Sequence, residues 1–150
     1  MREILFRGKQ LDSGKWLEGY ITYRYRYDKQ SKKEILGPVI DTPHKFAFGE
    51  AAGMVIGSIQ VTQGTEGQFT GLTDRNGTKI FEGDIVEAVL TDGIHYGFSW
   101  GRQVVVFDRG AFGLKDRREE ITPMCNYAAN VAFEVLGNIY DNPELLEATE

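Results

Sequence analysis

The amino-acid sequence predicts a mainly β fold, and three features of the 150-residue chain lead to that prediction. Apolar and polar residues alternate with a period of two over several stretches, as they do in strands with one buried face. Eighteen glycines supply many positions suited to turns. The apolar runs are short and separated by turn residues, far below the roughly 18 residues that a membrane-spanning helix needs.

The first long strand is predicted over residues 16–27. Its second half reads Tyr-Arg-Tyr-Arg-Tyr, so an extended chain places the tyrosines on one face and the arginines on the other. The polar residues 28–33 predict a hairpin tip, and residues 34–40 predict a returning strand.

Two prolines follow in the returning strand. Pro38 and Pro43 cannot donate a backbone hydrogen bond, so we expect them to mark a sheet edge or the exit of the chain from the sheet. Residues 44–52 show no strand pattern, and their alanines allow one helical turn that Gly49 and Gly53 keep short, so we expect a loop. Residues 54–62 are rich in β-branched residues and predict a further strand.

The centre of the chain predicts a tight hairpin. Asn76 and Gly77 are the preferred pair for a two-residue type I′ turn, since both tolerate positive φ. This turn is expected to fold residues 69–73 back on residues 78–81. After a second turn, residues 85–90, which are almost entirely apolar, predict a central strand that is buried on both faces.

The last third of the chain is also predicted to consist mainly of short strands and turns. Residues 91–102 hold three glycines and predict a long loop with Trp100 near its end. Further strands are expected at residues 103–107, 111–115, 119–122 and 133–139. Asn142 and Pro143 are a helix start signal, so we expect a short C-terminal helix whose two leucines dock on the β domain.

Three blocks of this chain resemble the YopX protein family, whose members occur mainly in phages and prophages of Gram-positive bacteria. The blocks are residues 2–7 together with 14–20, the central stretch QFTGLTDRNGTKIFEGDIV at residues 68–86, and residues 134–146. The resemblance implies a small barrel similar to Src-homology-3-like barrels, and it implies no catalytic residues. The turn and core residues of the central block favour a role in folding over a binding motif.

These observations together predict one domain, residues 1–150. It consists of an N-terminal hairpin and irregular part, residues 1–62, and a barrel core with the C-terminal helix, residues 63–150. The first ten residues alternate charged and apolar side chains, which is unlike a signal peptide, and we expect the protein in the host-cell cytoplasm.

Composition limits the chemistry available to the chain. The net charge of −5 works against binding to nucleic acid and anionic membranes. Cys125 is the only cysteine, which excludes an internal disulfide, and we expect it to be a buried, inert thiol. His44 and His95 lack metal-ligand spacing, and no nucleotide-binding motif occurs, so no cofactor is predicted.

One segment, residues 23–33, is both basic and aromatic. It carries a net +4 against −9 for the remaining chain. The candidate binding residues are Tyr23, Arg24, Tyr25, Arg26, Tyr27 and Lys29, together with Trp100 from the glycine-rich loop. Such a segment could bind single-stranded nucleic acid, with bases on the tyrosines and phosphates on the cations. An edge hairpin whose charges discourage aggregation is the favoured interpretation, because the acidic remainder of the chain works against nucleic-acid binding.

We therefore expect a phage or prophage accessory protein that acts by binding and not by catalysis. The expected partner is a host or phage protein, or a second copy, with the basic hairpin against an acidic face. Single-stranded nucleic-acid binding is the first alternative. The second is a hydrolase built from the carboxylates of Asp74, Glu82, Asp84 and Glu87, which the sequence does not place in one cleft.

Overall fold

The computed structural model describes residues 3–48, 51–93 and 98–147, with the side chains of residues 44–48 and 51–55 left aside. The described chain is mainly β, as the sequence predicts, and its only helical segments are two short 3-10 turns. It divides into two compact units, Met1–Gln68 and Phe69–Glu150. That the two units form one domain remains a prediction. None of the helical segments in the described ranges has the length and apolar character to cross a membrane.

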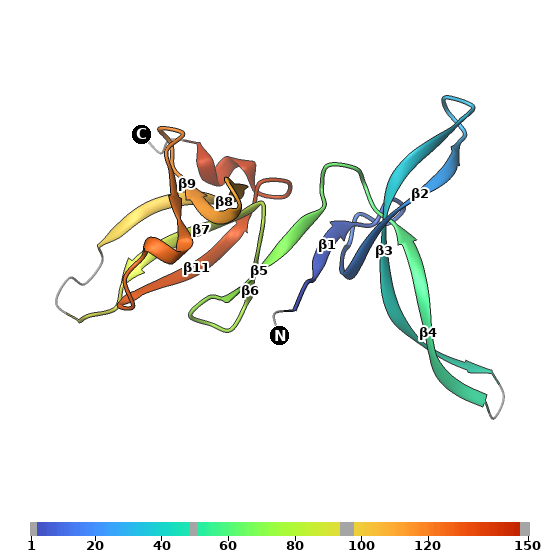
Figure 1. Ribbon diagram of the computed structural model, residues 1–150, viewed down its shortest axis with the longest axis horizontal. Helices are drawn as coiled ribbons and strands as arrows, with labels where there is room; N and C mark the ends of the chain where they lie inside the picture. The colour runs from blue at the N-terminus through green and yellow to red at the C-terminus, as the bar shows by residue number, and fades with distance from the viewer. Residues whose placement is uncertain (1–2, 49–50, 94–97, 148–150) are drawn as a thin grey trace. The chain divides into compact units, whose positions relative to one another are not determined.

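The first unit is an antiparallel sheet with the order β4-β3-β2-β1-β5 (Figure 1). Its strands are β1 (Phe6–Lys9), β2 (Trp16–Asp28), β3 (Lys33–Phe48), β4 (Ala51–Gln60) and the start of β5 (Gly67–Thr73). The predicted hairpin tip and returning strand are confirmed, because β2 pairs with β3 from Tyr20↔Asp41 to Asp28↔Lys33.

Strand β3 changes partner along its length. Residues 33–41 pair with β2, whereas residues 39–48 pair with β4. Only the three residues 39–41 therefore pair with a strand on each side. The two hairpins therefore project from opposite ends of β3 (Figure 1). Pro38 lies one residue before the β4 register begins, and Pro43 lies beyond the β2 register. The chain does not leave the sheet at either proline, because each has a strand in register on one side only.

The loop expected over residues 44–52 was a wrong prediction. Strand β3 continues to Phe48 and β4 begins at Ala51, with Lys45↔Met54 and Phe46↔Gly53 among the paired positions. Hydrogen bonding between the strands determines the backbone here, and it outweighs the weak strand preference of Ala and Gly.

A small core stabilises the base of this unit. Its buried residues include Leu5, Pro38, Val39, Ile40, Val61 and Thr65. Two glycines let the strands approach closely there. A Cβ atom at Gly19 would lie 2.4 Å from the Asp41 carbonyl oxygen, and one at Gly8 would lie 2.9 Å from the Val61 side chain. The base is therefore closely packed.

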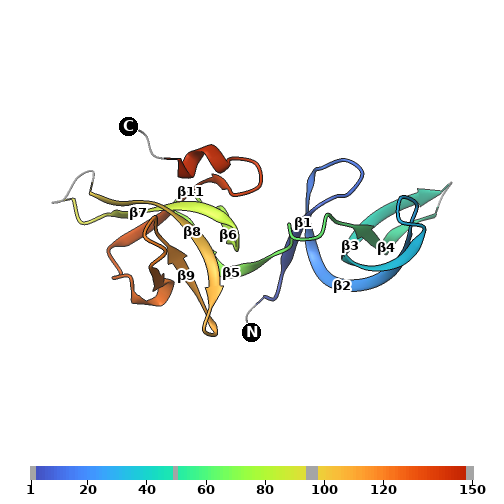
Figure 2. The ribbon, with the colours of Figure 1, turned by 90° about the horizontal axis from the view of Figure 1, so that it is seen from above.

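The second unit contains a five-stranded antiparallel sheet with the order β10-β9-β8-β7-β11, preceded by a hairpin of β5 and β6. Its strands are β6 (Lys79–Phe81), β7 (Asp84–Leu90), β8 (Ser99–Asp108), β9 (Ala111–Lys115), β10 (Ile121–Pro123) and β11 (Val131–Asn138). Figure 2 shows the curvature of β7 and β8. The predicted central strand is confirmed, since β7 lies between β8 and β11.

The core of this unit lies on one face of the sheet. Its fully or nearly fully buried members are Ile80, Val86, Ala88, Val105, Leu114 and Met124. Phe112, Tyr127 and Phe133 pack against this cluster. On the other face of β7, Ile85 is also fully buried. Strand β7 therefore has buried residues on both faces, as its mostly apolar sequence predicts, although Glu87 and Val89 on the second face are half-buried.

The barrel implied by the family resemblance is not closed in the described chain. Strands β10 and β11 are the two edges of an open sheet, and they do not pair with each other. Strand β10 has only three residues and ends at Pro123, which has no N–H group to extend a ladder.

The expected C-terminal helix is instead a single 3-10 turn, Pro143–Leu146. The Asn142 side chain makes no cap hydrogen bond there, because its Oδ1 accepts from the backbone N–H of Asn138 at 3.3 Å. Leu145 and Leu146 are half-buried, and the carbonyl oxygen of Leu145 accepts a hydrogen bond from Arg102 at 3.0 Å.

The turn at Asn76-Gly77 exists but is not the predicted type I′. Only Gly77 has positive φ, at 83°, and the backbone N–H of Asp74 donates to the Thr78 carbonyl across a three-residue loop. The two-residue turn with both φ values positive occurs at Arg109-Gly110, between β8 and β9. Asp74 selects the longer loop, because its Oδ1 accepts from the N–H groups of Asn76 and Thr78 at 2.8 and 2.9 Å.

Asp74 also links this turn to β11. Its Oδ2 accepts from the backbone N–H of Val135 at 3.1 Å, and the residue is only 7% exposed. Burial opposes ionisation of the carboxyl, but the hydrogen bonds from Val135, Thr78 and Asn76 prevail and hold the pKa of Asp74 below its ordinary value. A charged group thus ties the β5–β6 hairpin to the sheet.

We predict that Asp74→Ala destabilises the protein by on the order of 3 kcal/mol, because three backbone donors lose a charged acceptor. Asp74→Asn should cost less, since the amide oxygen can still serve Asn76 and Thr78. The pKa of Asp74 is lower in the folded than in the unfolded chain. The contribution of Asp74 to the free energy of unfolding is therefore complete above about pH 4, and it is lost as pH falls through the pKa of the folded state. Urea unfolding at about pH 7 and about pH 2 measures both effects.

Glu134→Ala is the matched control, because it removes only an exposed ion pair with Arg75, at 3.8 Å. It should cost less than about 1 kcal/mol. Equal losses of stability for Glu134→Ala and Asp74→Ala would contradict this role of Asp74. So would a difference in stability between the wild type and Asp74→Asn that does not shrink in acid.

Candidate functional site

The hairpin of β2 and β3 sorts the candidate residues onto two faces. Directly paired residues share a face of an antiparallel sheet. Tyr23 pairs with Pro38, Tyr25 with Leu36 and Tyr27 with Glu34, and these positions form the tyrosine face. Arg24 and Arg26 lie on the opposite face, which we call the arginine face, together with Asp41. The alternation predicted from the sequence is therefore confirmed.

The tyrosine face is exposed. Tyr23, Tyr25 and Tyr27 are 52%, 74% and 63% exposed, and Leu36 is 48% exposed. Tyr23 is held in place at the base of the hairpin, where its hydroxyl donates to a Glu66 carboxylate oxygen at 3.2 Å. Partial burial and the Glu66 charge raise the pKa of Tyr23. This side of the hairpin presents aromatic surface without a covering layer among the described residues.

The arginine face makes internal contacts. Arg24 Nη2 lies 3.4 Å from Asp41 Oδ2, and Arg26 Nη1 donates to Gln60 Oε1 at 3.1 Å. The Asp41 carboxylate also accepts from the hydroxyls of Thr22 and Ser58. Both arginines thus connect β2 with β3 or β4.

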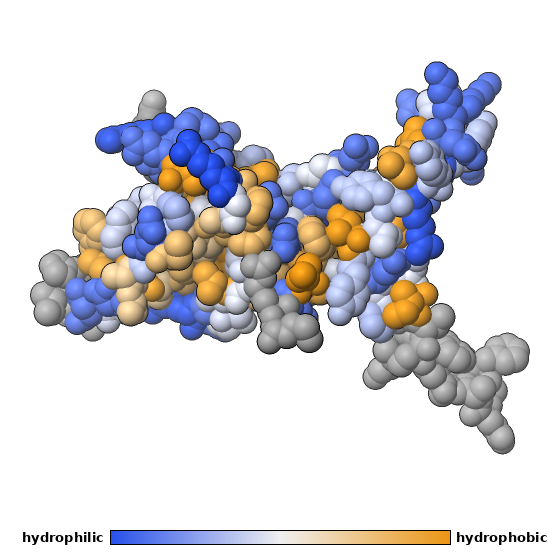
Figure 3. Space-filling model, in the orientation of Figure 1, coloured by the Kyte–Doolittle hydropathy of each residue, from blue (hydrophilic) through white to orange (hydrophobic). Residues whose placement is uncertain are grey.

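The tip of the hairpin carries the remaining positive charge. Lys29, Lys32 and Lys33 are exposed, and Lys32 has a φ of 54° in the turn. Asp28 accepts from the backbone N–H of Ser31 at 2.8 Å. Hydrogen bonds from Ser31 hold the pKa of Asp28 below its usual range. Figure 3 shows this end of the hairpin coloured mainly as hydrophilic.

One edge of β2 is free in the described chain. Residues 20–28 pair with β3 on one side, while on the other side β1 pairs only with residues 16–19. Unpaired backbone N–H and C=O groups along such an edge can accept another strand. The hairpin therefore combines exposed tyrosines with an open sheet edge.

Trp100 belongs to the other unit and is not part of the hairpin. It lies in β8, is 43% exposed, and contacts Phe98 and Tyr127 edge-to-face at 5.1 and 5.7 Å. Its exposure was expected from the glycine-rich sequence around it. That sequence could not show that Tyr127, which lies after β10, completes an aromatic wall with Trp100.

The carboxylates considered for hydrolysis have structural contacts. Asp84, which is 1% exposed, accepts from the backbone N–H of Phe81 at 2.8 Å, and Glu87 accepts from the Ser99 hydroxyl. Asp74 likewise accepts a hydrogen bond from the Val135 backbone N–H, so these three carboxylates connect elements of the second unit. Within residues 3–48, 51–93 and 98–147, no three His, Cys, Asp or Glu side chains are grouped as metal ligands.

Other reactive side chains are also accounted for. Cys125 is exposed, so the expectation of a buried thiol was wrong: it lies in the 3-10 turn Met124–Asn126, where only Met124 points into the core. His95 and the side chain of His44 fall outside the described part of the chain.

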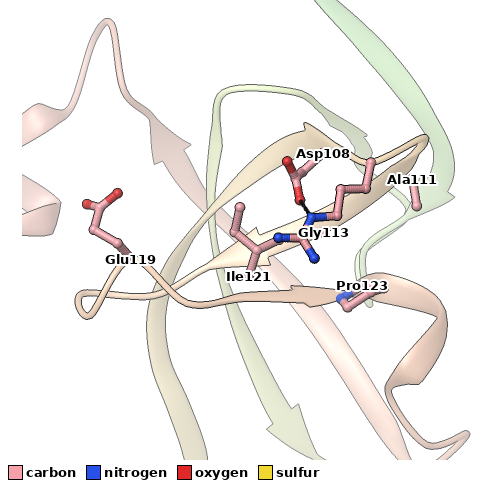
Figure 4. A pocket seen from close by; sticks show the side chains of 7 residues that line it. Asp108, Ala111, Gly113, Glu119, Ile121 and Pro123 are labelled. Carbon is pink, nitrogen blue, oxygen red and sulfur yellow. Dashed lines mark ion pairs between the residues drawn. The ribbon is translucent and has the colours of Figure 1, made fainter.

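A shallow pocket lies beside the turn between β8 and β9 (Figure 4). Its volume is about 340 Å³, and Ile121 and Gly113 line its floor. A Cβ atom at Gly113 would lie 2.7 Å from Ile121 Cγ2, so the glycine makes room for the isoleucine. Arg109 also lines the pocket and pairs with Asp108 at 3.5 Å, and Figure 4 marks this ion pair with a dashed line. Nothing in this arrangement indicates a ligand.

Comparisons with known proteins address the family and the fold. The family model described as YopX protein matches residues 5–147. The crystal structure of protein EF1440 from Enterococcus faecalis is similar, with 24% identity, a TM-score of 0.55, and coverage of 98% of this chain and 100% of that chain. The crystal structure of protein yopX from Bacillus subtilis has 17% identity, a TM-score of 0.50, and full coverage of both chains. No curated protein matches.

We predict that the hairpin does not bind single-stranded nucleic acid. The tyrosines and arginines face opposite ways, and both arginines have partners, so bases and phosphates cannot be engaged on one face. Fluorescence anisotropy of a labelled oligonucleotide of about 20 nucleotides at low salt should show no saturable binding at micromolar protein.

The variants Arg24→Glu with Arg26→Glu, and Lys29→Gln with Lys32→Gln, should leave the anisotropy unchanged. Circular dichroism confirms that each variant is folded. Saturable binding that either pair of substitutions abolishes would overturn this prediction.

Proposed function

Because the chain belongs to the YopX protein family, for which the resemblance suggests a phage or prophage setting and no catalytic residues, we propose that it acts by binding a protein. The contact surface is the tyrosine face of the β2–β3 hairpin and the free edge of β2. The observation that carries this proposal is the exposure of Tyr23, Tyr25 and Tyr27 on a strand with one unpaired edge. The expected setting is the host cytoplasm, as an accessory protein.

Exposed tyrosines suit a protein interface. A tyrosine ring provides a large, rigid apolar surface at low entropic cost, and its hydroxyl can hydrogen-bond at the rim. Tyr25 and Leu36 are directly paired, so their side chains form one continuous apolar surface. Isolated apolar residues on a surface need no explanation, but a row of three aromatic rings along one strand favours an interaction site.

The free edge of β2 supports strand addition. An extended segment of a partner can pair with residues 20–28 through the backbone, while the tyrosines contact its side chains. Natural sheets usually protect such edges with charges or proline. Here Arg24 and Arg26 are turned to one face and engaged with Asp41 and Gln60, which leaves the tyrosine face less protected.

The first partner to test is a second copy of the chain. The hairpin segment is basic, while the remainder carries a net −9, so two copies attract one another when the hairpin of one meets acidic surface of the other. Such attraction is weakened by salt.

We predict that light scattering at tens of micromolar shows an oligomer whose mass falls as salt rises. Tyr25→Ser combined with Tyr27→Ser should shift it toward the monomer at all salt concentrations, because the two most exposed rings of the face are lost. Hydrogen exchange should show that amides in residues 20–28 are protected more at high than at low protein concentration.

Tyr20→Ser is the matched control, since Tyr20 lies on β2, is 63% exposed and is on the arginine face. It should leave the mass unchanged. A strict monomer throughout the concentration range would rule out self-association. Equal effects of Tyr20→Ser and the double variant would rule out the tyrosine face as the contact.

A further inference from the structure

A cavity in the second unit, which we call the Trp100 pocket, has a chemistry unlike that of the hairpin. Its volume is about 510 Å³. The residues that line it include Leu90, Trp100, Gln103, Asp116, Glu120, Tyr127 and Val131. This volume is large enough for an amino-acid side chain with part of its backbone.

The walls of the pocket are aromatic. The rings of Trp100 and Tyr127 meet at 83°, and Tyr127 continues edge-to-face to Phe133 at 5.4 Å. Trp100 is 43% exposed, whereas Tyr127 and Phe133 are half-buried and pack on the core. The core thus holds one ring of the wall in place, and the indole remains accessible to a ligand.

The charge of the lining is negative. Asp116 and Glu120 contribute carboxylates, and among the described lining residues there is no Lys or Arg. Asp116 is oriented by the backbone N–H groups of Arg118 and Glu120, which donate to its Oδ1 at 2.8 and 3.0 Å. Its charge, added to the larger effect of burial, raises the pKa of Tyr127. Lys115 and Arg117 line a second cavity, which shares Asp116 with this one but not Glu120.

A buried amide also faces this pocket. Gln103 is only 5% exposed, and its Oε1 accepts from the Tyr127 hydroxyl at 3.3 Å. Its Nε2 donates to none of the described residues, and the side chain is part of the lining. The Nε2 atom is accessible from the pocket and can therefore donate to a ligand or to solvent.

We propose that the Trp100 pocket binds the positively charged side chain of a lysine or arginine of a partner protein. A cation is attracted by the aromatic rings and by the two carboxylates at once. The alkyl part of such a side chain contacts Leu90 and Val131, and Gln103 donates to a carbonyl oxygen of the same residue. Anions are repelled, and a neutral apolar side chain leaves the carboxylates without a partner. This site is independent of the hairpin surface.

The test uses the full chain and four capped amino acids. Nuclear magnetic resonance follows the indole N–H signal of Trp100, which Trp100→Phe distinguishes from that of Trp16. N-acetyl-lysine methylamide and N-acetyl-arginine methylamide should shift it with saturation in the millimolar range, as the small size of the probes allows. N-acetyl-norleucine methylamide, which lacks the charge, should bind at least about 5-fold more weakly. N-acetyl-glutamate methylamide should not bind.

Glu120→Gln should weaken lysine binding by about 3- to 10-fold, because it removes one of the two carboxylates. Glu119→Gln is the control, as it makes the same change of charge at the adjacent position, outside the Trp100 pocket. It should change the affinity by less than about 2-fold. Equal binding of the norleucine or glutamate probe, or equal effects of the two variants, would overturn the proposal.

One further variant tests whether the Trp100 pocket binds independently of the hairpin surface. Tyr25→Ser with Tyr27→Ser should leave the lysine titration unchanged, even though it removes the hairpin surface. Loss of the titration in that variant would mean that the indole signal does not report on an independent pocket.

Discussion

The register between β2 and β3 decides what the hairpin can present. Tyr20 is opposite Asp41, and each following pair along the two strands alternates between the faces. In this register Arg24 lies opposite Gly37, where a Cβ atom would be 3.1 Å from Arg26 Nε. The missing side chain makes space for the Arg26 guanidinium to reach Gln60. A slip of one residue would break these contacts and place new neighbours beside each tyrosine.

The same register is the reason why we do not expect this basic, aromatic segment to bind nucleic acid. The arginines connect β2 with β3 and β4, and Asp41 gathers Arg24, Thr22 and Ser58 around one carboxylate. The tyrosines remain on the opposite face, where no second layer of the described chain covers them. Aromatic surface and positive charge are thereby separated on the two faces of the hairpin.

In the second unit, buried polar side chains act as structural connections. Asp74 joins the β5–β6 turn to β11, Asp84 caps the end of β6, and the Thr70 hydroxyl donates to the Ile80 carbonyl oxygen at 2.9 Å. All three belong to the central block by which the family resemblance is recognised. The block is therefore explained by folding. The proposed contacts with partners lie outside it, on the tyrosine face and in the Trp100 pocket.

The sequence by itself determined the features that depend on neighbours along the chain. Alternation placed Tyr25 and Arg24 on opposite faces, and the apolar run of β7 indicated a strand buried on both sides. Only the tertiary structure decided that β3 continues past Pro43, that Asp74 selects a three-residue turn, and that the sheet stays open. It also decided which residues share the Trp100 pocket. Strand pairing and side-chain hydrogen bonds join residues far apart in sequence, and local patterns carry no information about such distant partners.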